Sequence, residues 1–321
     1  MRSLLLIITL LFTGCGRPGD KPETHLSVRE QLEQRRSEYL TLLPDVQGEA
    51  GFVDADHCDS VLFSGLMASS GIDSIDVEAA EDDAKPGRWY RRPVTEPECY
   101  SIGASRSTIS RDMLLGVMWW AWAEKRLDVL ERMWSYGEAR DWFMGDDSAG
   151  GFHTQLGPLI PLLAREILAL GGEDHWAWRR IPLASESDEG KTDFEAHLQV
   201  LQIMLNAEVS YGVTEKGLAR LREQAERQPG NPLFQYALHA WTDGQLDVAA
   251  NLLLNEQYWP TGRLPTSADR CSNWVLERDS GADWEPCDAG RTHSGGDLLF
   301  TSWLILRSTT LEQSLGVTSA D

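Results

Sequence analysis

The chain has 321 residues, of which 50 are acidic and 29 basic, so its formal net charge at pH 7 is −21. This acidity argues against binding to nucleic acid and against electrostatic attraction to an anionic lipid surface. The length suffices for one large domain or two small ones.

An apolar run occupies the beginning of the chain. Residues 4–12 are apolar apart from Thr9, and a single positive residue, Arg2, precedes them. This pattern is typical of a secretion signal, and the run is too short and too close to the start to be a transmembrane helix. We therefore expect residues 1–14 to be a signal peptide.

The signal ends in a short motif around the first cysteine. Leu11-Phe12-Thr13-Gly14-Cys15 resembles the lipobox of bacterial lipoproteins, although Phe12 stands where that motif usually has Leu, Val or Ile. The resemblance implies that Cys15 is diacylated and becomes the mature N-terminus, so that its acyl chains anchor the protein in a membrane. Because Gly16 and not Asp follows the cysteine, the resemblance also implies the outer membrane in a Gram-negative cell.

Beyond the signal, the sequence indicates a short tether followed by helices. Residues 15–25 are polar and contain two prolines, which is typical of a linker. Residues 26–321 are expected to form a single all-α domain, because no stretch shows the sustained alternation that a strand requires. The predicted helices cover residues 26–43, 59–68, 110–125, 127–137, 154–170, 193–211, 214–228, 231–243, 246–256 and 296–308.

The helix predicted at 110–125 is the central one. From Met113 to Trp122 it is apolar on every side, whereas a surface helix keeps its apolar residues on one stripe. Ser110 stands at the N-cap position and Asp112 in the first turn, where a carboxylate suits the helix dipole. We therefore expect other helices to surround this one.

Two helical architectures fit these elements. One is an α/α toroid, complete or incomplete, with apolar inner helices inside amphipathic outer helices, and the other is an open stack of helical hairpins. Residues 225–254 resemble the tetratricopeptide repeat. The residues near its usual positions are Pro229, Tyr236, Ala237, Gly244 and Ala249. A solenoid needs about three copies to bury its faces, and we find one good copy, so this segment predicts a single helical hairpin.

Three aspartates, Asp59, Asp112 and Asp297, each stand at the start of a predicted apolar helix. If these are inner helices of a toroid, they run parallel and their N-termini meet on one rim. Paired carboxylates there would supply a general acid with a base or nucleophile, as in glycoside hydrolysis. We expect Asp112 and either Asp59 or Asp297 to fill these roles. The simpler alternative is that each acid only complements a helix dipole.

Loops next to the expected rim carry side chains that suit a sugar. Aromatic rings there can stack on a sugar face, and arginine and histidine can donate hydrogen bonds. The predicted substrate-binding residues are Arg111, Trp89, Tyr90, Arg91, His153 and His293. In architecture the chain resembles the α/α-toroid glycoside hydrolases and polysaccharide lyases, which implies an enzyme acting on a glycan. The acidic balance of the chain favours hydrolysis over lyase chemistry on an anionic sugar.

A second class of function stays open beside the enzyme. The same sequence fits a non-enzymatic lipoprotein that presents helical hairpins to a protein partner in the envelope. A pocket lined by the three aspartates would favour the enzyme, whereas an apolar groove along residues 214–256 with capped aspartates would favour the binding protein. In both cases the acyl chains hold the protein on the membrane.

Four cysteines besides Cys15 point to disulfides, since an even number in an exported chain is usually paired. We favour Cys58–Cys99 and Cys271–Cys287 among the three pairings, because each closes a loop between helices expected to be neighbours. No two of these cysteines have the short spacing of a zinc knuckle, so we expect no metal. No glycine motif for a phosphate or a dinucleotide occurs, so we expect no cofactor.

Overall fold

The computed structural model describes residues 26–53, 60–95, 109–144, 156–183, 193–269 and 292–308. Within these ranges the protein is predominantly helical and has no β-strand, which confirms the all-α class. Extended pairing in these ranges is limited to isolated bridges between Gln47 and Val53, Glu81 and Trp89, and Thr266 and Thr292.

The described residues include eleven α-helices. The first six are α1 (Val28–Leu42), α2 (Ser60–Ser69), α3 (Arg111–Ala123), α4 (Leu127–Glu138), α5 (Ile160–Ala169) and α6 (Trp176–Arg179). The others are α7 (Asp193–Ser210), α8 (Glu215–Arg227), α9 (Pro232–Ala240), α10 (Asp247–Leu253) and α11 (Gly296–Arg307). Single 3₁₀ turns occur at η1 (Leu43–Val46), η2 (Glu49–Gly51), η4 (Val77–Ala80) and η6 (Gly157–Leu159).

Every helix predicted from the sequence is present, with ends displaced by a few residues. The largest difference is at 154–170, where η6 precedes an α5 that begins only at Ile160. The four-residue helix α6 and the 3₁₀ turns are not predicted, because elements this short have no periodic pattern to read.

Polar side chains define several helix starts. The Ser27 hydroxyl accepts a hydrogen bond from the Glu30 amide at 3.2 Å, and the Glu30 carboxylate accepts one from the Ser27 amide at 2.7 Å, so a capping box begins α1. The side chains of Thr214 and Asn231 accept hydrogen bonds from first-turn amides of α8 and α9.

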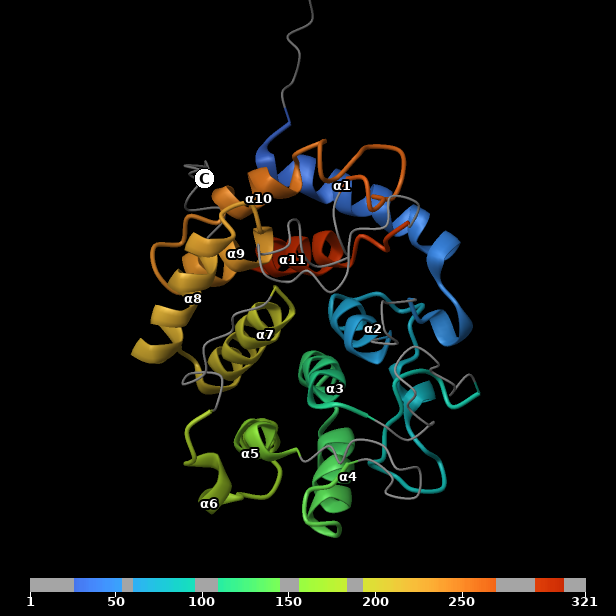
Figure 1. Ribbon diagram of the computed structural model, residues 1–321, viewed down its shortest axis with the longest axis vertical. Helices are drawn as coiled ribbons and strands as arrows, with labels where there is room; N and C mark the ends of the chain where they lie inside the picture. Colours follow the sequence, from blue (N-terminus) through green and yellow to red (C-terminus); the bar gives the residue numbers. More distant parts are fainter. Residues whose placement is uncertain are drawn as a thin grey trace, which may run out of the picture.

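Helices α2, α3, α7 and α11 surround the centre of the molecule, and the remaining helices lie outside them (Figure 1). In α3, every residue from Met113 to Ala121 is buried, which confirms the predicted central helix. The indole of Trp119 donates a hydrogen bond to the Leu201 carbonyl of α7 at 3.2 Å. The same ring packs edge-on against Phe300 of α11, with 5.4 Å between centroids.

The most extensive contact between helices joins α2 and α3, and it depends on two glycines. A Cβ atom added to Gly116 would lie 2.5 Å from the Cα atom of Leu62, and one added to Gly65 would overlap the Gly116 carbonyl group. The two backbones therefore lie directly against each other, which any side chain at these positions would prevent.

Helix α1 packs against segments that lie far apart in the sequence. Its Arg36 guanidinium donates to the Ser70 carbonyl after α2 at 2.6 Å, and Arg29 donates to the Leu306 carbonyl in α11 at 3.0 Å. The Tyr39 hydroxyl donates to the Pro260 carbonyl at 3.1 Å. These contacts connect the N-terminal helix to α2, to α11 and to the chain after α10.

Helices α9 and α10 pack against each other as the predicted hairpin. Gly244 lies in the turn between them with φ of 71°, a conformation that favours glycine. Residues 232–253 therefore form one pair of packed helices.

Candidate functional site at the starts of α2 and α3

The first turn of α3 places charged side chains at one end of the central helix. Asp112 is half-buried and Arg111 is exposed. Ser110 occupies the N-cap position, but its hydroxyl accepts no hydrogen bond from a first-turn amide. It accepts one from the Arg91 guanidinium instead, at 3.0 Å. Arg91 therefore binds the start of α3.

The start of α2 lies against the same arginine. The backbone carbonyl of Arg91 accepts a hydrogen bond from the Val61 amide at 2.9 Å, in the first turn of α2. The Ser60 hydroxyl donates to the Val53 carbonyl at 2.6 Å. Asp59, which precedes Ser60 in the sequence, lies outside the described residues.

Helices α2 and α3 run in the same direction. Arg91 contacts the first turn of one and the N-cap residue of the other, so the two starts lie close together. Gly65 and Gly116, the sixth residue of each helix, also lie together. The positive ends of two helix dipoles therefore meet beside Arg91, and the predicted parallel arrangement is correct for this pair.

The aromatic residues next to Arg91 are less accessible than the sequence predicts. Trp89 is 0% exposed, so the prediction that its ring is free to stack on a ligand is wrong. The backbone of Trp89 pairs with that of Glu81 in an isolated bridge, and its ring lies in the core. Tyr90 is half-buried; its hydroxyl donates to Asp82 at 3.1 Å, and the Arg88 guanidinium lies 5.0 Å from its ring centroid.

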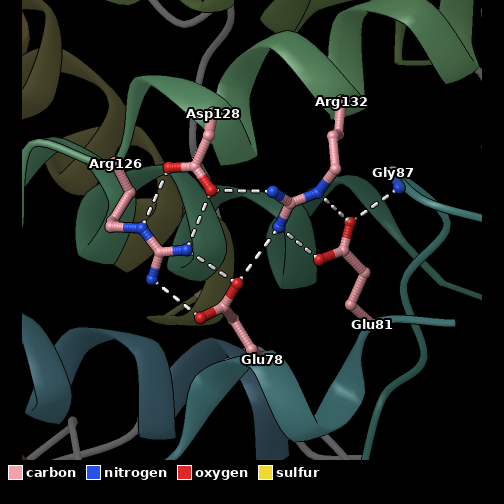
Figure 2. Close-up of polar contacts among 6 residues, drawn as sticks. All are labelled: Glu78, Glu81, Gly87, Arg126, Asp128 and Arg132. Carbon is pink, nitrogen blue, oxygen red and sulfur yellow. Dashed lines mark hydrogen bonds and ion pairs between the residues drawn. The ribbon is translucent and has the colours of Figure 1, made fainter. Parts of the chain in front are cut away.

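A network of charged groups fixes the segment before this site against α4, and Figure 2 shows its members: Glu78, Glu81, Gly87, Arg126, Asp128 and Arg132. Arg132 contacts Glu81 at 2.6 Å and Asp128 at 2.7 Å, and Arg126 contacts Glu78 at 2.7 Å. The Glu81 carboxylate also accepts a hydrogen bond from the Gly87 amide at 2.7 Å. Residues 78–87, which lead to Arg91, are thus held against Arg126 and Arg132.

Hydrogen bonds within this network change the acidity of its carboxyls. Those from Arg126 lower the pKa of Asp128 far below its ordinary value and also lower the pKa of Glu78. Both carboxyls therefore stay ionised at neutral pH, which suits a structural role and not that of a general acid.

The start of α11 does not lie beside the starts of α2 and α3. The Ser294 hydroxyl is 3.8 Å from the sulfur of Met67, in the C-terminal half of α2. Phe300 contacts Trp119, in the C-terminal half of α3. Met67 lies six residues beyond Val61, which is about 9 Å along the axis of α2. Asp297, between Ser294 and Phe300, is therefore separated from Asp112, and the prediction that all three helix starts meet on one rim is wrong for α11.

Asp297 is 1% exposed and accepts a hydrogen bond from the Leu298 amide at 3.1 Å. His293 is also 1% exposed; its amide donates to the Pro265 carbonyl at 2.8 Å, and its ring lies 3.3 Å from the Ser267 hydroxyl. These contacts join Pro265 and Ser267 to His293, which lies on the other side of residues 270–291 in the sequence. His293 therefore lies near the start of α11 and not at the starts of α2 and α3.

The remaining predicted residues cannot be placed. His153 and the cysteines lie outside the described residues: Cys15, Cys58, Cys99, Cys271 and Cys287. In the described ranges no group of three or more His, Cys, Asp or Glu side chains is arranged to hold a metal ion. Within the same ranges, no helix combines the length and apolar character needed to cross a membrane.

Two buried titratable residues were not predicted as functional. Glu166 of α5 is 0% exposed, and burial raises its pKa well above the ordinary value. His197 of α7 is 1% exposed, and burial lowers its pKa to about 3. A signal for Glu166 exists in the sequence, because it stands four residues after Leu162 and three after Leu163, on the apolar face of its helix.

Comparison with known proteins gives no matching family model, no matching curated protein and no matching solved structure. A functional proposal for this chain therefore depends on its own residues.

Proposed function

We propose that this protein is a lipid-anchored hydrolase of the bacterial envelope that acts on a glycan at the starts of α2 and α3. The observation that supports this most directly is the position of Arg91, which contacts both helix starts and so gathers polar groups from distant parts of the sequence. Asp112 lies in the first turn of α3 in a half-buried position, from which a carboxyl can reach a ligand.

In this proposal Asp112 and Asp59 are the acid and the base or nucleophile, and Asp297 has no part in the reaction. The separation of the two carboxyls would decide between retention and inversion. Arg91, Arg111 and the hydroxyl of Tyr90 would bind sugar oxygens, assisted by the positive ends of two helix dipoles. The finer architecture that we propose is an incomplete α/α toroid with α2 and α3 as parallel inner helices.

The change Asp112→Asn tests the catalytic role. Loss of a general acid or base lowers turnover by about 10²- to 10⁴-fold, so we expect that loss with a melting temperature close to that of the wild type. Hydrolysis of a panel of envelope glycans and thermal denaturation are the two measurements. Asp297→Asn is the control: it should lower stability and leave turnover of the folded protein unchanged. An Asp112→Asn protein that is unstable yet fully active would make Asp112 a helix-dipole residue.

The anchor is a separate proposal with its own test. Two or more acyl chains hold a protein stably on a membrane, whereas a single chain does so only marginally. Cys15→Ala should therefore move the protein from the membrane fraction to the soluble fraction and abolish incorporation of a labelled fatty acid. Equal membrane association of the variant and the wild type would contradict acylation at Cys15.

A non-enzymatic lipoprotein that binds a protein partner is the second candidate. The buried residues of α8 are Gly217, Leu221, Gln224 and Ala225, so this helix turns a charged face outward beside the α9–α10 hairpin. This charged face differs from the apolar groove that we expect of a binding protein at residues 214–256. Absence of both turnover and bound glycan across the panel would favour this candidate.

A further inference from the structure

Glu166 is a carboxyl buried in the core. Its side chain is 0% exposed, and neither carboxyl oxygen has a hydrogen-bond partner among the residues that the structure describes. Glutamate is almost never fully buried unless it is paired, and buried polar groups are nearly always hydrogen-bonded. Glu166 lies on α5, outside the α2–α3 site, so that site does not explain why the core contains a carboxyl.

The described helices around α5 give Glu166 no hydrogen bond that could stabilise a charge. The elements that pack most closely against α5 are α4, α6, α7 and η6. Their charged or titratable side chains in the described part of the chain, with those beside α6, are Asp128, Glu131, Arg132, Tyr136, Glu138, Glu173, Asp174, His175, Arg179, Arg180, Glu195, His197 and Glu208. None of these is hydrogen-bonded to Glu166, and burial is the single cause of the increase in its pKa. The carboxyl is therefore stable here only in its neutral form.

The corner formed by α5 and α6 is held by packing between the two helices and by polar and aromatic contacts. Arg165, the neighbour of Glu166, donates to the carbonyls of Arg179 and Ile181 at 3.0 Å each and to the Asn206 side chain of α7 at 2.6 Å. The His175 ring, just before α6, stacks on Trp134 of α4 with 3.5 Å between centroids. Because α6 has only four residues, it can move only if its packing against α5 and these contacts are lost together.

We propose that the α5–α6 corner is a proton-controlled latch, closed while Glu166 is protonated and opened when the carboxyl loses its proton and needs water. Opening would separate α6 from α5 and the His175 ring from Trp134 of α4, and would enlarge an apolar surface that begins with Leu168, Trp176 and Ile181, which are exposed in the closed state. An exported protein experiences the pH of its surroundings, so such a latch would respond to external alkalinity.

Hydrogen exchange of the full-length protein between pH 5 and pH 9 tests the latch. Exchange rates are divided by the intrinsic rate at each pH, and peptides from 160–181 are compared with peptides from α9. Between the ordinary pKa of a solvated glutamate, 4.5, and the raised pKa of the buried carboxyl, closing becomes tenfold less favourable with each further pH unit. We expect protection in 160–181 to fall by about that factor per unit while α9 stays protected.

Two variants at the same position and one nearby control complete the experiment. Glu166→Gln and Glu166→Leu cannot lose a proton, so protection in 160–181 should be independent of pH in whichever variant folds. Glu173→Gln changes an exposed carboxyl in the same corner and should behave like the wild type. Constant protection in the wild type up to pH 9, an unchanged pH dependence in the Glu166 variants, or equal loss of protection in α9 would each overturn the latch.

Discussion

Gly116→Ala is expected to destabilise the protein by about 3 kcal/mol or more, although the same change inside most helices is favourable. Alanine exceeds glycine in helix propensity by about 1 kcal/mol, so α3 considered alone would gain stability. The added Cβ atom, however, would lie 2.5 Å from both the Cα atom and the carbonyl oxygen of Leu62. Backbone atoms cannot rotate away as a side chain can, so α2 and α3 must separate and lose packing along their whole contact.

Urea unfolding followed by circular dichroism at 222 nm measures this effect. Gly212→Ala is the matched control, because a Cβ atom at Gly212 would meet no atom within 4 Å. Its free energy of unfolding should stay within about 0.5 kcal/mol of the wild type. If the two variants were equally stable, the backbones of α2 and α3 could not be in direct contact.

The same contact sets the geometry of the proposed site. Arg91 spans the starts of α2 and α3, and the distance between these starts is fixed where Gly65 meets Gly116. A variant that separates the helices should therefore disturb the position of Asp112 as well as stability. Loss of activity in Gly116→Ala would consequently say nothing about catalysis, whereas loss in a stable Asp112→Asn protein would.

The helices are predictable from the sequence because their signals are local. The apolar run around Met113 to Trp122 identifies a buried helix without any knowledge of its neighbours. The direction of α11 is different, since nothing in the spacing of Asp297 shows that Ser294 packs against Met67. An aspartate at the start of an apolar helix predicts the common rim. The start of α3, with Asp112, lies beside the start of α2 as expected, whereas the start of α11 lies beside the C-terminal halves of α2 and α3.

Exposure of single loop residues is equally hard to predict. Trp89 lies in a polar segment rich in arginine, which predicts a surface ring, yet the ring lies in the core and the backbone pairs with that of Glu81. Arg132 of α4 binds Glu81 from a position 51 residues further along the chain. Long-range ion pairs of this kind decide which side of a loop faces the core, and no periodicity reports them.

His197→Gln and Glu166→Gln are expected to change the pH dependence of stability in opposite directions between pH 4.5 and pH 6.5. The pKa of His197 falls from 6.5 to about 3 in the folded protein, so its neutral form stabilises folding above pH 6.5, and this stability is lost as the pH falls. The pKa of Glu166 is raised, so its contribution is complete below about pH 4.5 and is lost as the pH rises. Each slope is about 1.4 kcal/mol per pH unit.

In the wild type the two slopes oppose each other, so its free energy of unfolding should change little across this window. Without Glu166, stability should fall by about 2 to 3 kcal/mol from pH 6.5 to pH 4.5, and without His197 it should rise by a similar amount. Urea unfolding at several pH values measures both. Carboxylates with lowered pKa values, such as Asp128 and Asp269, lose their contribution only below about pH 4.5 and stay outside the window. Parallel curves for the two variants would mean that neither side chain is buried in the folded protein.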